Sequence, residues 1–331
     1  MNNKSFQGDH IDSAKVGAAK GTTGPANGTG SERLRPAFKI IKENLTQCLF
    51  WAENAGMERY FQHQAELAQK ECNLRCPEDC SAPGCWMAEV IVEVSLFDLI
   101  RLSLVLNTPV SSLFLQHCFI GLENLEINSR YQRLLIKLKK PCNFLQKAHC
   151  RVHGSKPLNC ILFPEYHQLK GMIPNLVNNP IFKGFPCLKA EIKVSQARSN
   201  ALETLRGMSC REEALSNHFI FDTPSFIIDS KPLTKLLKQH QSKDLSGSIQ
   251  DYEQLVSVVL KSSGFFDGIM NSIYQLDTRL GKESLFEKLN DDALMKPLLE
   301  KLNRPDAIYR LKGNRFIRLK RTLQPPEVIF M

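Results

Sequence analysis

The sequence predicts an α+β protein that is mainly helical, with a cysteine-rich metal-binding domain of short strands followed by a helical C-terminal part. Three observations support this prediction. Of the eleven cysteines, nine lie between residues 72 and 187, where proline and glycine interrupt short apolar runs. Beyond residue 190, apolar residues recur mostly at helical spacing. Hydrophobic residues make up 43% and charged residues 23% of the 331-residue chain, which is typical of globular proteins.

The chain divides into three segments. Residues 1–36 are polar and rich in glycine, so we expect a disordered tail. Residues 37–190 should form the cysteine-cluster metal-binding domain with N-terminal helices, and residues 191–331 a helical C-terminal region that ends in a basic hairpin. The N-terminus has no apolar signal segment, and no apolar run is long enough to span a membrane. The sequence therefore predicts a cytoplasmic protein with no membrane partner.

Short elements are expected in the cysteine-rich domain. Residues 37–71 carry apolar side chains at helical spacing, and Gly56 divides them into two helices. Two stretches, 88–94 (AEVIVEV) and 131–139 (YQRLLIKLK), read as strands. Between them, the Ser95-x-x-Asp98 capping pattern predicts a helix through about residue 106. Thr108 as N-cap, with proline after it, predicts a second helix through about residue 118.

The C-terminal region is expected to contain helices over 196–208, 231–241, 251–263 and 291–303. The closing stretch IYRLKGNRFIRLKRTL alternates, with a Gly-Asn turn signal at 313–314, and predicts a hairpin. One face of this hairpin would be a basic ribbon, able to meet phosphates or an acidic protein surface. A solvated edge strand protected by charge is the more frequent explanation. The net charge of +9 requires no acidic partner, and nucleic acid is not expected as one.

The cysteines carry the main functional signal. Eight of them are candidate ligands. The opening cluster, CNLRCPEDCSAPGCW, contains Cys72, Cys76, Cys80 and Cys85. A second group contains Cys142, Cys150 and Cys160, and Cys187 is one further member. Disulfides are rare in a reducing compartment, and thiolates are soft ligands that favour zinc or iron–sulfur clusters. Eight donors suit two four-coordinate sites or one cluster with additional ligands. Buried thiols and disulfides remain the alternatives.

The spacing leaves the metal open. No C-x2-C pair occurs, so this is not a standard zinc finger, and the spacing is not that of the common ferredoxins. The cofactor expected is zinc or iron, the latter including a 4Fe-4S cluster.

The pattern resembles the zinc- or iron-chelating cysteine-cluster family (YkgJ-type, CxxxCxxCC), which includes the flagellin lysine N-methylases. The resemblance covers roughly residues 68–190 and is most specific in CNFLQKAHCRVHGSKPLNCILFP. The residues that match this downstream element are Cys142, Phe144, Leu145, Cys150, Pro157, Cys160, Phe163 and Pro164. The chain departs from the family pattern in lacking an adjacent Cys-Cys pair and in carrying Lys156 where the family has arginine.

The resemblance implies metal chelation, and for the methylase branch iron–sulfur chemistry. Two hypotheses follow: a cytosolic metal-binding protein with a structural or carrier role, or an iron–sulfur-dependent protein lysine N-methylase acting on a protein such as flagellin. No G-x-S-x-G, H-E-x-x-H, Walker or G-x-G-x-x-G sequence is present, so whether the protein is an enzyme stays open and no catalytic residue is assigned.

Other polar residues near the cysteines have simpler explanations. His149 and His153 flank a cysteine and could complete a coordination sphere, but a surface or orienting role is preferred. Asp98 is expected to be the acid of a capping box. Cys118 is expected in the core, and the isolated Cys48 and Cys210 are taken as structural. His117 beside Cys118, and Glu78 and Asp79 inside the opening cluster, are not expected to be ligands.

Overall fold

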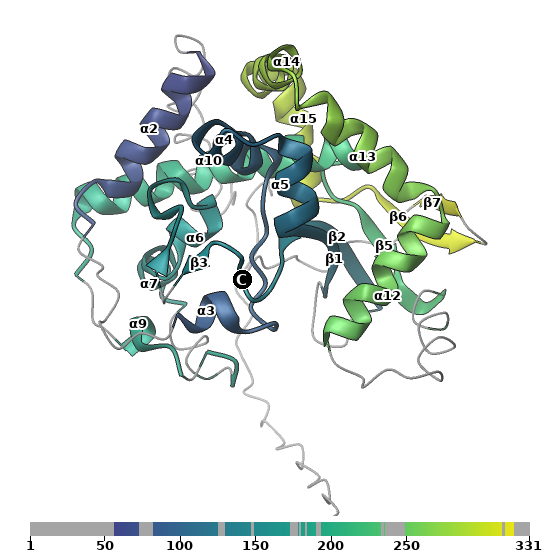
Figure 1. The fold of residues 1–331 in the computed structure, drawn as a ribbon, viewed down its shortest axis with the longest axis horizontal. Coiled ribbons are helices and arrows are strands. Elements are labelled where there is room, and N and C mark those ends of the chain that lie inside the picture. The colour runs from purple at the N-terminus through teal and green to yellow at the C-terminus, as the bar shows by residue number, and fades with distance from the viewer. Residues whose placement is uncertain are drawn as a thin grey trace, which may run out of the picture.

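The structure is a computed structural model, and it confirms the expectation of a mainly helical α+β fold (Figure 1). It describes residues 56–72, 82–124, 130–146, 149–172, 178, 180–182, 184–189, 193–232, 235, 249–312 and 315–320. The expected tail over 1–36, the first expected N-terminal helix and most of the helix expected over 231–241 lie outside these residues.

A five-stranded sheet, in the order β1-β2-β5-β6-β7, forms one side of the molecule (Figure 1). Its strands are β1 (Cys118–Asn124), β2 (Tyr131–Leu138), β5 (Ile227–Asp229), β6 (Ala307–Lys312) and β7 (Arg315–Lys320). All neighbours are antiparallel except β5 and β6, which run parallel. The sheet thus combines two strands that precede residue 190 with three that follow it.

The long helix α10 (Gln196–Phe221) is the centre of the helical part. Buried side chains lie all along it, including charged residues such as Glu212, which is 1% exposed. A helix buried on most of its circumference has no single apolar stripe. It packs against α2 (Met57–Gln69), α4 (Leu96–Leu106), α13 (Phe265–Gln275), α14 (Arg279–Asn290) and α15 (Asp292–Asn303), as well as the short helices described below.

The expected helix boundaries are confirmed at α2 and α4. Gly56 is the N-cap of α2, and Ser95 caps α4 in a complete capping box with Asp98. The prediction that Thr108 is an N-cap is wrong: the Thr108 hydroxyl donates to the carbonyl of Leu106, and α5 (Val110–His117) starts without a side-chain cap of its own. A carboxylate from elsewhere takes that role.

Asp277 supplies the N-terminal cap of α5. Its carboxylate accepts from the Ser111 backbone N–H at 2.9 Å and from the Ser111 hydroxyl at 2.6 Å. The N–H groups of a first helical turn need acceptors, and these can come from any part of the chain. Because the two residues are 166 positions apart, sequence reasoning could not find this cap.

The expectation of a strand over 88–94 is wrong. Only an isolated bridge forms there, between Glu93 and Lys137 of β2. The short helix α3 (Pro83–Trp86) and the turn after it end just before this segment, and the α4 capping box starts at Ser95. Few residues remain for a ladder. The strand expected over 131–139 is confirmed as β2, and Cys118, expected in the core, is 3% exposed at the start of β1.

The C-terminal hairpin is confirmed by the β6–β7 pairing, which runs from Ala307 opposite Lys320 to Lys312 opposite Arg315; the turn residues 313–314 lie outside the description. One face of the hairpin packs on an aromatic cluster, in which the Phe226 and Tyr309 rings stack at 4.1 Å. α12 (Ile249–Ser262) crosses this side of the sheet with α13 (Figure 1). On β6, Arg310 bonds the carboxylate of Asp229 on β5, so part of the basic ribbon is neutralised.

In the described part of the chain, no single helix has the length and apolar character needed to cross a membrane. α4 and α5 meet the criteria only as a pair, and the chain bends by 109° between them.

Candidate metal centre

Two predicted ligands, Cys85 and Cys142, come from segments that lie side by side. Cys85 is in α3, and Cys142 follows the end of β2. The Cys142 N–H donates to the carbonyl of Cys85 at 2.8 Å. The Lys140 ammonium also bonds the carbonyl of Gly84. The two backbones are therefore joined at this point, which places Cys85, the last cysteine of the opening cluster, next to the downstream element.

Cys150 and Cys160 approach the same place from the downstream element. The N–H of Leu145 donates to the carbonyl of Cys142 at 2.9 Å, and Leu145 on β3 (Leu145–Gln146) pairs with Cys150 on β4 (His149–Cys150). Cys160 lies in the short helix α6 (Leu158–Leu162). Cys142, Cys150 and Cys160 are free thiols of intermediate exposure, which excludes disulfides among these three.

The electrostatics of the thiols reflect their proximity. Burial raises the pKa of Cys160 to about 12, and the charges of Cys85 and Cys142 raise it as well, whereas Lys140 and Lys156 oppose the shift. Burial also raises the pKa of Cys150, with a smaller contribution from Cys142. Charges interact measurably only over short distances in a protein. The thiols are thus mutually within range, with two ammonium groups beside them.

The position of α6 is fixed by the first turn of α4. The Asp98 carboxylate accepts from the N–H of Leu158, at the start of α6, at 2.9 Å. Arg101 donates to Asp98 at 2.8 Å and to the carbonyl of Lys156 at 2.7 Å. The capping role expected for Asp98 is confirmed, but the same carboxylate also caps the cysteine-bearing helix. Lys156 is held by its backbone carbonyl, and its charge opposes the raised pKa of Cys150 and Cys160.

Cys187 lies in α9 (Pro186–Lys189), near this group. Phe185, just before it, has a ring atom 3.5 Å from the point where a Cβ on Gly84 would stand. The Phe185 ring also meets Phe163 edge-on, with 6.1 Å between the ring centroids. The residue just before α9 is therefore packed against both α3 and the Phe-Pro end of the downstream element.

Cys72 lies in a different environment from the thiols above. Its Sγ is 3.8 Å from Oε2 of Glu165 at the start of α7 (Glu165–Leu169). Glu165 forms a fully buried ion pair with Arg198 of α10, in which both side chains are 2% exposed. Arg198 also donates to the carbonyls of Leu67 and Ala68 near the end of α2. Cys72 is itself exposed, but its thiol contacts a carboxylate that is buried against α10.

Cys76 and Cys80, and with them Glu78 and Asp79, lie outside the described residues. Within the residues that are described, no group of three or more Cys, His, Asp or Glu side chains is arranged to hold a metal ion. Cys85, Cys142, Cys150 and Cys160 are near one another without forming a complete chelating set by themselves.

The three histidines near the cysteines differ in exposure. His149 and His153 are both exposed, and the charge of Lys156 and burial lower the pKa of His153. His117 stacks on Phe144, with centroids 4.2 Å apart, and burial lowers its pKa. Cys210 is buried in α10 as a free thiol, as expected.

Sequence reasoning missed a group of buried acids behind the candidate site. Burial raises the pKa of Glu212 to about 8, and Asp98 raises it further, while Arg101 opposes the shift. Burial likewise raises the pKa of Glu93 to about 8, with Arg133 opposing it. The only signal in the sequence was the pair of adjacent acids in the helical stretch CREEALSN, which is usually a solvated face.

The chain was compared with protein-family models, with curated proteins and with solved structures, and none of the three comparisons gave a match.

Proposed function

We propose that this protein binds a metal, zinc or an iron–sulfur cluster, through the thiolates of its cysteine cluster. The observation that carries the proposal is the backbone link between Cys85 and Cys142, which joins two cysteine groups distant in sequence. Cys150, Cys160 and Cys187 lie on elements packed around this link, and Cys72, Cys76 and Cys80 belong to the same opening cluster. Lys140 and Lys156 would partly balance the negative charge of a thiolate-bound centre.

Anaerobic purification followed by iron, zinc and acid-labile sulfide analysis tests the proposal. We expect at least about one metal centre per chain, with brown colour if it is iron–sulfur and no colour if it is zinc. Cys142→Ala and Cys160→Ala should each lose most of the metal. Cys210→Ala is the matched control, because Cys210 is also buried but lies in α10. Full metal content in both site variants, or none in the wild type, would exclude the proposal.

A second candidate function is protein lysine N-methylation of the flagellin type, with an iron–sulfur centre. It is favoured by the extent of the helical part, since α10 to β7 is far more than a chelating module requires. Co-expression with flagellin and intact-mass measurement should reveal methyl additions, and Cys160→Ala should abolish them. Iron–sulfur content without any mass shift would leave the metal proposal standing and refute the methylase.

A further inference from the structure

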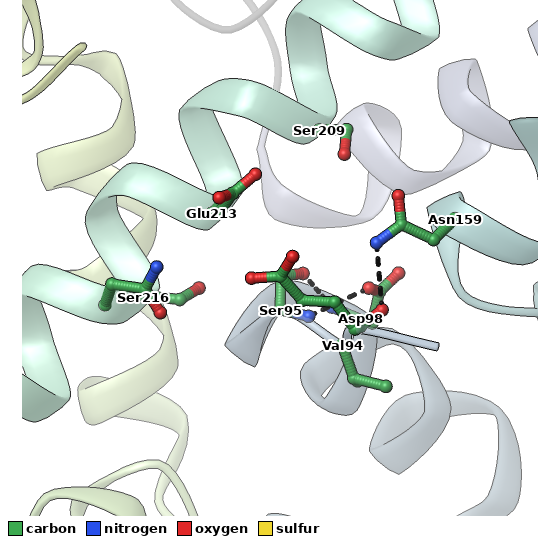
Figure 2. A pocket seen from close by; sticks show the side chains of 9 residues that line it. Val94, Ser95, Asp98, Asn159, Ser209, Glu213 and Ser216 are labelled. Carbon is green, nitrogen blue, oxygen red and sulfur yellow. Dashed lines mark hydrogen bonds between the residues drawn. The ribbon is translucent and has the colours of Figure 1, made fainter. Parts of the chain in front are cut away.

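A small polar cavity lies between the N-terminal end of α4, α6 and the middle of α10 (Figure 2). It has room for about one water-sized group. Figure 2 shows Ser209 and Glu213 extending from α10 toward Ser95, Asp98 and Asn159 on the opposite side. Most of the lining residues are polar, and Val94 adds an apolar side chain. The cavity contains none of the proposed thiol ligands.

Three hydrogen-bond acceptors at this cavity have no hydrogen bond within the described part of the chain. Ser209 is 7% exposed, its hydroxyl points into the cavity, and it has no partner there (Figure 2). Glu213 pairs with Arg133 through Oε1 only, leaving Oε2 without a bond. Asn159 donates to the carbonyl of Glu93 through its amide nitrogen, at 3.0 Å, and its amide oxygen is unused. Ser209 and Glu213 are buried and Asn159 is half-buried. Buried polar atoms normally have partners, so this set indicates a bound group that donates hydrogen bonds.

When Glu93 and Glu212 are ionised, above the pKa of about 8 to which burial raises each of them, the charge around the cavity is unbalanced toward the negative. A single guanidinium, that of Arg133, pairs with Glu93, Glu123 and Glu213. On the other wall Asp98 pairs with Arg101, and the charges of these two residues shift the pKa of the nearby Glu212 in opposite directions. Arg206 is the other cation that acts on Glu93. Buried carboxylates in excess of their cations must take up protons or a cation.

We propose that this cavity binds an ammonium-type cation, NH4+ or the head of a very small primary amine. Such an ion is about the size of a water molecule, carries the missing positive charge and donates hydrogen bonds in a tetrahedral arrangement. Ser209 Oγ, Glu213 Oε2 and the Asn159 amide oxygen accept three of them. The proposal does not depend on the thiols binding metal.

Two other occupants fit the site less well. A chelated divalent ion needs several oxygen ligands at short distance, and the described residues contain no group of three acids, cysteines or histidines arranged for a metal. A neutral water would satisfy some of the acceptors but would leave the charge excess unchanged. The combination of unused acceptors and excess negative charge therefore selects a donor cation.

Thermal unfolding of the full chain tests the proposal in chloride salts of equal ionic strength. At about pH 9, where Glu93 is ionised, about 100 mM NH4Cl or methylammonium chloride should raise the Tm by a few °C relative to choline chloride. KCl should raise it less, because K+ has a similar size but no N–H donors. A slowly exchanging ammonium signal in spectra with 15NH4Cl gives a direct readout. If both ammonium salts raise the Tm, the cavity opens to solvent widely enough to admit the methyl group. If only NH4Cl raises it, the cavity is closed to the methyl group.

Two variants connect the effect to the cavity. Ser209→Ala should cut the NH4Cl-dependent shift at least about twofold, and Glu213→Gln should abolish it, since the variant loses the charge. Ser272→Ala, at a half-buried position of α13 that does not line the cavity, should retain the full shift. If NH4Cl, KCl and choline chloride give the same Tm for the wild type, a water occupies the cavity and the proposal is wrong. An undiminished shift in Ser209→Ala would also overturn it.

Discussion

Replacing Asp98 by alanine should be among the most destabilising single changes in the protein. The Asp98 side chain is 3% exposed and accepts from the N–H of Ser95 at 3.0 Å, the N–H of Leu158 at 2.9 Å and Arg101 at 2.8 Å. Asp98→Ala therefore removes one of the two bonds of the α4 capping box, the acceptor at the start of α6, and the charge partner of a buried guanidinium.

The magnitude follows from these three losses. Leaving one charge of a buried pair without its partner costs about 3–5 kcal/mol. Arg101 retains the amide oxygen of Gln64, at 2.6 Å, and the carbonyl of Lys156, and the nearby Glu212 supplies some compensating charge. The lower end of that range thus applies, and the lost caps add about 1 kcal/mol. We expect a loss of about 4 kcal/mol in the free energy of unfolding.

Urea unfolding followed by circular dichroism measures this loss. Asp306→Ala is the control: Asp306 also has cationic partners, Lys301 and Arg318, but is 42% exposed, so we expect a change below about 0.5 kcal/mol. Adding Arg101→Met to Asp98→Ala should restore about 1–3 kcal/mol, because no unpaired charge then remains. A loss below about 1 kcal/mol in Asp98→Ala, or no recovery in the double variant, would refute the reasoning.

Three further predictions concern stability alone. The folded-state pKa of Glu212, about 8, is above its ordinary value of 4.5, so its contribution is present below pH 4.5 and is lost as pH rises toward 8. For one group, the fall in unfolding free energy across this window is up to about 1.4 kcal/mol per pH unit, and Glu212→Gln should reduce it. If urea unfolding at several pH values gave the same slope for the variant as for the wild type, the prediction would be contradicted. Gly281→Ala should destabilise the protein by about 1–3 kcal/mol, because the new Cβ would stand 1.9 Å from a backbone oxygen. Gly268→Ala, in open space on α13, should stabilise it by about 0.5–1 kcal/mol. Equal effects of the two variants in calorimetry would refute the steric argument. Asp229→Asn should lower the unfolding free energy by about 2–3 kcal/mol in urea, because the carboxylate is 1% exposed and bonds both Arg130 and Arg310. A loss no larger than that of Asp306→Ala would show that these bonds contribute little.

Local signals in the sequence were sufficient for helices such as α2, α4, α12 and α15 and for three strands, β2, β6 and β7, but they did not predict α13 or α14. The capping box at Ser95 and Asp98 is a contact between residues three apart, so it can be read directly. The hairpin at β6 and β7 is equally local. By contrast, the cap that Asp277 provides to α5 and the pairing of β2 with β5 join distant residues, and no pattern within a short window specifies them.

The same contrast between local signals and distant contacts holds for the candidate site. The clustering of cysteines was evident from the sequence, and so was the grouping of Cys142, Cys150 and Cys160 in one element. That Cys85 and Cys142 share a hydrogen bond depends on how α3 packs against the end of β2, which is a tertiary effect. The buried acids of α10 could not be expected at all, because charged residues on a helix are normally solvated.

The order of the sheet has a consequence for dissecting the protein. Strand β5 contributes three residues, yet among the described strands it alone joins β1–β2 to the C-terminal hairpin in the sheet. Expression of residues before 190 alone would leave β2 with an unprotected edge on a two-stranded ribbon, a form that is marginal in water and prone to pair with other chains. Aggregation of such a fragment would therefore report a missing neighbour strand and would say nothing about its thiols.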